Sequence, residues 1–265
     1  MKYYCMQPDF RKEITGEIYP QIQEYYNLDY SGKGHLFTAH LVHTYNATFV
    51  NRSRYYDKIY SKYPSRRDSL EGLKLHSWSK PSDVISCAMV DEPHLVVSKK
   101  FTELLKTCDV SKYHINKATI YWRKKLISDY YIFYLLKLKE FLPYVDLERS
   151  EFCTYKNVTQ HMDYTFEGDF VESFNCRSEK ELLNVRNHKP KNFEKDVEYK
   201  TFCSKVYLRN TLPENRDILI LSFIPYVKYY KAFSYCYSER FVEKFLSSGL
   251  TGVEFELIDE LFVDE

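Results

Sequence analysis

The chain has 265 residues, of which 44% are hydrophobic and 28% charged, and 38 Lys and Arg balance 37 Asp and Glu to a net charge of +1. This length and composition exclude an intrinsically disordered protein and indicate a globular chain of one large or two modest domains. The balanced charge disfavours a dedicated nucleic-acid coat, and only seven glycines disfavour a Gly-rich phosphate loop. Frequent Tyr and Phe (26 and 18) fit either a protein-binding surface or a composition bias.

The first eighty residues predict a mixture of short elements. The expected elements are a strand over 2–6, a helix over 18–26, β-structure over 36–50 and a helix over 53–63. The next segment, 65–83, is polar and contains Pro81, which is typical of a linker or long loop. We therefore expect two domains, an N-terminal α+β lobe over 1–83 and a C-terminal lobe over 84–265.

The second lobe predicts strands that alternate with short helices. An apolar run over 95–97 leads into Ser98, a residue type that caps helices, and helical spacing of apolar residues follows it. Further strands are expected over 113–122, 130–138, 206–208, 218–224 and 252–258, and a further helix over 180–186. The pattern is weak across most of 153–205, which leaves the role of that region unassigned.

A short sequence recurs 140 residues along the chain. Each copy follows an apolar segment, opens a helix and precedes a strand, and Gly249 can end the second helix. The structural motif comprises Ser98, Phe101 and Glu103 in the first copy and Ser238, Phe241, Glu243, Gly249 and Gly252 in the second. We expect a duplicated strand–helix–strand unit around 94–121 and 233–258, within an α+β fold of mixed or antiparallel sheets and short helices. A chance match is the alternative.

Residue types that carry catalysis or bind metals are present but poorly arranged. His35, His40 and His43 lie in a β-rich stretch, where alternation points the middle side chain away from the other two, so surface imidazoles are favoured over a metal site. Acid pairs such as Glu167 with Asp169 are common on any exposed strand or loop. No catalytic, cofactor-binding or metal-ligating residue is assigned, and no cofactor is expected.

Charge is unevenly distributed along the chain. The segment 99–125 carries eight Lys and Arg against two acids, whereas 251–265 carries six acids and no base. These segments fit solvated faces, a nucleic-acid surface on the basic run, or an acidic edge that docks a basic protein. The sequence begins without an apolar signal region, and its seven cysteines are odd in number with no C-x-x-C spacing. We expect reduced thiols, a cytoplasmic location and no membrane span.

Several segments resemble a bacterial immunity-protein family of polymorphic toxin systems, immunity protein family 11 or domain of unknown function 1629. The resemblance covers about residues 84–258 and rests on 94–105, 130–132, 145–150, 237–241 and 249–255. It implies a non-enzymatic protein that binds and neutralises a cognate toxin by forming a stoichiometric complex. The matching positions are core types, so they do not mark the contact surface.

Residues for contact with a toxin come instead from exposed acids and tyrosine doublets. The candidates are Asp259, Glu260, Asp264, Glu265, Tyr25, Tyr26, Tyr55 and Tyr56. The alternative function is a nucleic-acid-binding accessory protein that uses the basic face from Lys99 to Lys125, with Tyr121 and Trp122 stacking on bases. The identity of the toxin and the oligomeric state stay open.

Overall fold

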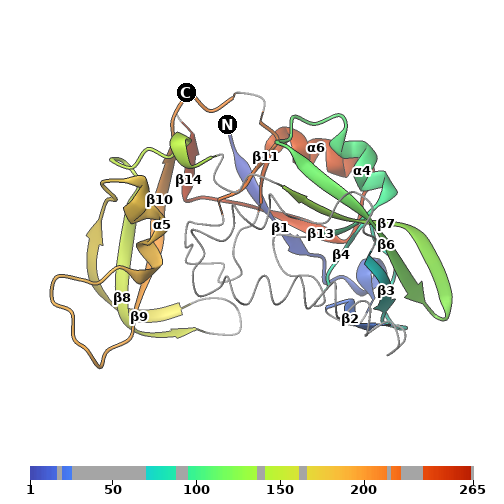
Figure 1. Cartoon of the computed structure of the whole chain (residues 1–265), viewed down its shortest axis with the longest axis horizontal. Helices are drawn as coiled ribbons and strands as arrows, with labels where there is room; N and C mark the ends of the chain where they lie inside the picture. Colours follow the sequence, from blue (N-terminus) through green and yellow to red (C-terminus); the bar gives the residue numbers. More distant parts are fainter. Residues whose placement is uncertain are drawn as a thin grey trace. The chain divides into compact units, whose positions relative to one another are not determined.

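The computed structural model describes residues 1–16, 20–25, 70–87, 95–135, 141–160, 166–213, 216–221 and 235–263. These residues form three mixed or antiparallel sheets with a few short helices (Figure 1), which confirms the expected sheet types, although the chain is richer in strands than expected. The elements predicted over 36–50 and 53–63 lie outside the described residues.

Two compact units are interleaved along the chain. Unit 1 contains residues 1–5, 138–239 and 257–265, and unit 2 contains residues 6–137 and 240–256. The expected domain boundary between residues 83 and 84 lies inside unit 2.

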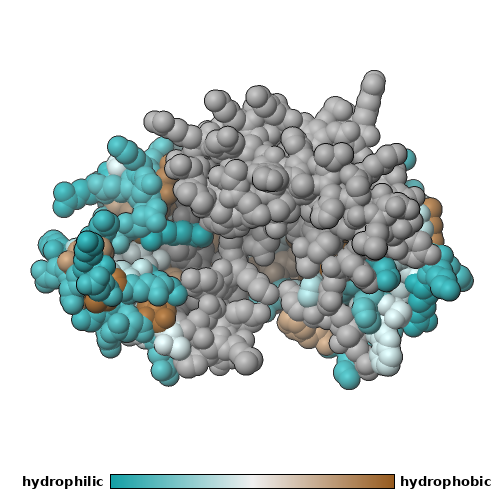
Figure 2. Space-filling view, turned by 60° about the horizontal axis from the view of Figure 1, so that its bottom comes forward, coloured by the Kyte–Doolittle hydropathy of each residue, from teal (hydrophilic) through white to brown (hydrophobic). Residues whose placement is uncertain are grey.

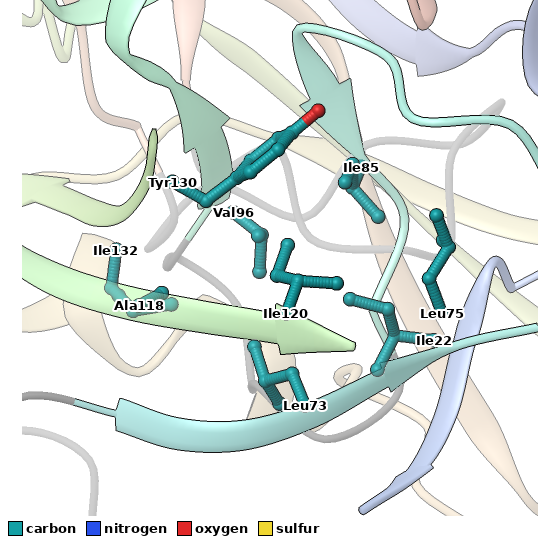
Figure 3. Close-up of a cluster of buried hydrophobic side chains, with 9 residues drawn as sticks. All are labelled: Ile22, Leu73, Leu75, Ile85, Val96, Ala118, Ile120, Tyr130 and Ile132. Carbon is teal, nitrogen blue, oxygen red and sulfur yellow. The ribbon is translucent and has the colours of Figure 1, made fainter. Parts of the chain in front are cut away.

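The largest sheet, in unit 2, has six strands and contains the parallel pair β3–β6, its other pairs being antiparallel. Its order is β2 (Ile22–Tyr25), β3 (Leu70–Leu75), β6 (Tyr113–Trp122), β7 (Lys125–Leu135), β5 (Leu95–Ser98) and β4 (Val84–Ile85). Aliphatic side chains of all six strands and Tyr130 gather into one buried cluster (Figure 3). Burying each Ile, Leu or Val side chain of this cluster stabilises the fold by about 1.5–3 kcal/mol, so the cluster anchors unit 2.

Two predictions fail in this sheet. The segment 18–26 was expected to be helical, but residues 22–25 form β2, and the expected linker 65–83 contains β3. The cause is pairing between distant segments: Ile22 lies opposite Leu75, and both side chains are fully buried. Burial in a sheet outweighs the local helical spacing because strand preference depends mainly on packing.

Helices α4 (Lys99–Leu105) and α6 (Glu239–Ser247) pack through aromatic rings. Phe101 is fully buried and lies 6.2 Å, between ring centroids, from both Phe241 and Phe245 in edge-on geometry. Such pairs add about 0.5–1.5 kcal/mol beyond the area that they bury. Lysine side chains reach across the pair, since Lys100 Nζ donates to Gly249 O and Lys244 Nζ donates to Thr107 O.

A second sheet has the order β11 (Ile218–Leu219), β12 (Cys236–Ser238), β1 (Tyr3–Pro8) and β13 (Val253–Leu257). Strand β1 confirms the strand predicted at the start of the chain, and it pairs antiparallel with β12, 235 positions later. Helix α1 (Lys12–Thr15) follows β1.

The third sheet belongs to unit 1. Its order is β14 (Leu261–Val263), β10 (Tyr199–Leu208), β8 (Glu151–Gln160) and β9 (Phe166–Phe174). Helix α5 (Glu179–Leu183) and the 3-10 turns Leu142–Tyr144 and Val185–Asn187 complete the described part of this unit. Strands β8 and β9 fall within or beside the region where the sequence pattern is weak, and α5 lies at the helix expected over 180–186.

Candidate binding surfaces

Ser98 caps α4 and is itself held by Asp83. Its Oγ accepts from Phe101 N at 3.2 Å and donates to Asp83 Oδ1 at 2.6 Å, while its backbone N donates to Asp83 O at 2.8 Å. The other carboxylate oxygen of Asp83 accepts from Thr251 N at 3.0 Å and from Thr251 Oγ1 at 3.2 Å. The predicted N-cap is therefore confirmed, and one carboxylate joins it to the segment that follows α6.

Ser238 has the same relation to a second aspartate. Its backbone N donates to Asp217 O at 2.9 Å, and its Oγ donates to Asp217 Oδ1 at 2.8 Å. Asp217 immediately precedes β11, as Asp83 immediately precedes β4. In both places the strand after the aspartate pairs antiparallel with the strand that ends at the serine.

A buried tyrosine faces each serine from the next strand. Tyr130 lies opposite Ser98, and its hydroxyl donates to Ser82 O at 2.8 Å. Tyr3 lies opposite Ser238, and its hydroxyl donates to Arg216 O at 3.1 Å. In each case the acceptor is the residue just before the aspartate, so two equivalent clusters of Tyr, Asp and Ser hold the starts of α4 and α6.

The remaining motif residues take scaffold positions. Glu103 is exposed and pairs with Lys106 one turn later, and Glu243 is exposed on α6. Gly249 and Gly252 have positive φ angles of 62° and 103°. At Gly252 a Cβ would clash with Val84 O, so close backbone packing requires glycine there.

The structure describes two of the four acids predicted to form a C-terminal contact edge. Asp259 is exposed and Glu260 is half-buried in the turn between β13 and β14. Two neighbouring acids already contact basic or polar side chains, since Glu254 pairs with Arg11 at 3.4 Å and Glu256 accepts from Gln7. Tyr25 lies in β2, and the other five predicted contact residues lie outside the described residues: Tyr26, Tyr55, Tyr56, Asp264 and Glu265.

An acidic and aromatic surface that the sequence did not predict runs along β9. Among the described strands β9 is the edge of its sheet, and residues 167–170 are all exposed. Phe170 is 60% exposed and makes an edge-on contact with Tyr155 on β8, at 5.8 Å between ring centroids. Figure 2 shows hydrophobic side chains among hydrophilic ones on the visible part of this unit, at the left of the view. We call Glu167, Asp169 and Phe170 the β9 surface.

His188 and Glu172 form a polar pair on the same sheet. His188 Nε2 lies 2.7 Å from Glu172 Oε1, and its ring stacks on Phe174 at 3.8 Å between centroids. Glu172 and Phe174 belong to β9, so this contact fixes the C-terminal half of the edge strand against the turn Val185–Asn187. It is a structural contact that stiffens the strand carrying the β9 surface.

Metal and thiol chemistry find little support in the described residues. Within the described ranges, no three His, Cys, Asp or Glu side chains are grouped so as to hold a metal ion, and His35, His40 and His43 lie outside those ranges. All seven cysteines are free thiols, as predicted. Burial raises the pKa of Cys176 to about 12 and raises the pKa values of Cys203 and Cys236, which keeps these thiols protonated and unreactive at neutral pH.

Comparison with known proteins gives no assignment. No known family's model matches the chain, and no curated protein matches it. In the part of the chain that the structure describes, no helix has the length and apolar character needed to cross a membrane.

Proposed function

We propose that this chain is a non-enzymatic immunity protein that binds and neutralises a cognate bacterial toxin in a stoichiometric complex. The family resemblance of residues 84–258 suggests this function, and the β9 surface is the observation that carries it. A cytoplasmic location is part of the proposal and is supported by the seven free thiols.

The β9 surface has the composition of a protein-binding edge. An edge strand offers unpaired backbone groups that an incoming strand can join, and side chains beside it select the partner. Glu167 and Asp169 give this edge negative charge, and Phe170 offers an exposed aromatic ring. The complementary partner is a basic protein segment that adds to β9 in extended conformation.

The acids and the aromatic ring have different kinetic roles in this proposal. Charges at the rim of an interface mainly speed association, whereas a desolvated aromatic anchor mainly slows dissociation. Asp259 and Glu260, at the turn before β14, extend the negative charge to another part of unit 1. We expect an interface of roughly 1,200–2,000 Å², the usual size for a stable complex.

The test is binding to the purified toxin domain encoded beside this gene. The wild-type chain should form a one-to-one complex, and cells that co-express it should survive the toxin. Phe170→Ser should mainly raise the dissociation rate, and Asp169→Lys should mainly lower the association rate at low salt. Glu243→Lys, an exposed charge reversal on α6, is the matched control and should bind like wild type. A wild-type chain that neither binds nor protects would refute the proposed function.

We also propose that the scaffold is built from two copies of one unit, larger than the strand–helix–strand repeat expected from sequence. Strands β4, β5, β7 and β6 are neighbours in that order in the six-stranded sheet, and β11, β12, β1 and β13 have the corresponding order. The two Tyr, Asp and Ser clusters occupy equivalent places in these sheets. In the second copy, the place of β7 is taken by β1, from the other end of the sequence.

A further inference from the structure

The hairpin that joins β6 and β7 has a strained, cationic tip. Trp122 pairs with Lys125, so Arg123 and Lys124 form a two-residue loop, and their φ angles are 49° and 66°. Positive φ at both positions is the pattern of a type I′ turn, which is normally built from Asn and Gly. Larger side chains in this conformation are strained, and such strain is found where function requires the side chains.

Two tryptophans accompany these cations. The Arg123 guanidinium lies 4.6 Å from the centroid of the Trp122 ring, and Arg123 Nε donates to Ser77 O at 3.1 Å. That hydrogen bond places the tip beside Trp78, whose side chain is 64% exposed. Trp78 and Trp122 are the two tryptophans of the sequence. We call Trp78, Arg123, Lys124 and Lys125 the hairpin-tip patch.

The structure divides the basic run 99–125 into separate groups. Lys100 donates to Gly249 O, and Lys106 pairs with Glu103, so these helical lysines serve the packing and solvation of α4. Arg123, Lys124 and Lys125 are consecutive and all exposed at the hairpin tip. The surface expected for the alternative function, nucleic-acid binding, therefore narrows from the whole face between Lys99 and Lys125 to this patch.

We propose that the hairpin-tip patch binds single-stranded nucleic acid, an activity separate from the proposed toxin binding. Three adjacent cations neutralise successive phosphates, and an exposed indole offers a flat surface on which an unpaired base stacks. Duplexes keep their base faces covered, so stacking selects single strands. An anionic membrane fits this patch less well as a ligand, because binding to a membrane surface needs several apolar side chains that insert into it. Where the structure describes side-chain exposure on this hairpin, Leu126 is the one large aliphatic side chain that is exposed.

Intrinsic fluorescence tests this proposal directly, because Trp78 at the patch and Trp122 beneath it are the chain's only tryptophans. The full chain is titrated with oligo(dT) or oligo(U) of about 20 nucleotides, with inorganic polyphosphate, and with phosphatidylserine vesicles. We expect quenching by the oligonucleotides that weakens steeply with salt, and weaker quenching by polyphosphate. Absence of quenching by both oligonucleotides, or a blue shift with vesicles alone, would overturn the proposal.

Variants distinguish residues that contact the nucleic acid from residues that only support the fold. Affinity is measured by the fluorescence anisotropy of a labelled oligonucleotide. Trp78→Ala should weaken binding about five-fold or more, the effect of losing one stacked base. Lys124→Gly should weaken binding and make the slope of log affinity against log salt shallower by about 0.7, while raising the melting temperature because strain is relieved. Lys191→Gln, an exposed change in unit 1, is the control and should bind like wild type. Unchanged binding by both Trp78→Ala and Lys124→Gly would also overturn the proposal.

Discussion

The half-buried carboxylate of Asp83 holds together Ser98 and Thr251, two residues that are far apart in the sequence. One carboxylate oxygen accepts from Ser98 Oγ and the other accepts from the backbone N and hydroxyl of Thr251. Asp83→Asn keeps the size of the side chain but places an amide NH₂ against one of these donor groups. We expect a loss of about 1.5–3 kcal/mol in the free energy of unfolding, measured by urea denaturation. Asp129→Asn, an exposed change on β7, should have little effect, and equal losses in both variants would contradict this role for Asp83.

Asp9 gives the chain a defined response to acid. Its side chain is buried, and the hydrogen bond from Arg11 at 2.6 Å is the main cause that holds its pKa below the usual 3.8. Stability from this pair is therefore present above about pH 3.8 and is lost as the pH falls through the lower, folded value. Asp9→Asn should lower the melting temperature at pH 7 and narrow its difference from wild type at pH 3. A constant difference between the two pH values would contradict this assignment.

Thiol reactivity should follow burial. Because burial raises the pKa of Cys176 to about 12, far less thiolate is present at pH 8 than for an ordinary thiol. We expect iodoacetamide to label the half-buried Cys108 much faster than Cys176 in the native chain, as measured by peptide mass spectrometry. In denaturant the two rates should converge, and a fast native rate at Cys176 would show that its environment is open.

At the scale of elements, Ser98 and Ser238 provide the sharpest test of the duplicated unit. Ser98→Ala removes an N-cap and should cost about 0.5–2 kcal/mol in unfolding free energy. If the copies are equivalent, Ser238→Ala should cost a similar amount, because both side chains donate to an aspartate in the same way. Ser247→Ala, near the end of α6, is the control; a loss at Ser98 without one at Ser238 would refute the equivalence.

Elements defined by local signals were predictable. Strand β5 and the cap at Ser98 follow from an apolar run and a neighbouring residue type, and both are confirmed. Strand β2 was not predictable, because it forms by pairing with a distant segment: Ile22 lies opposite Leu75, 53 positions away. The hairpin tip was missed because Arg123 and Lys124 stand where a type I′ turn normally has Asn and Gly.

The candidate surfaces show the same limit. Charge runs located the acidic and basic segments, but residues of one run belong to different elements: Lys106 caps the end of α4, whereas Lys124 lies in the loop between β6 and β7. Glu167 and Asp169 were visible as an acid pair, and Phe170 stands next to them. Only strand order reveals that they lie on an edge, and strand order is set by long-range pairing that no local pattern contains.

At the scale of the whole molecule, the expected redox state can be tested by counting free thiols. All seven cysteines are free thiols in the structure, although Cys5 and Cys236 lie directly opposite each other on β1 and β12. Ellman titration of the denatured, unreduced protein should therefore give seven thiols per chain. A value of five would indicate one native disulfide and would contradict the cytoplasmic location in the proposal.

The position of β1 has a consequence for synthesis on the ribosome. Strand β1 is translated before its partner β12, which follows 235 positions later. At about 5–20 residues per second, β1 emerges roughly ten seconds to one minute before β12 exists. The sheet β11-β12-β1-β13 therefore closes only when synthesis of the described residues is almost complete, whereas all strands of the six-stranded sheet are available by residue 135. In the interval between β1 and β12 the nascent chain carries an unclosed sheet, which makes β1 a natural site for a chaperone to occupy.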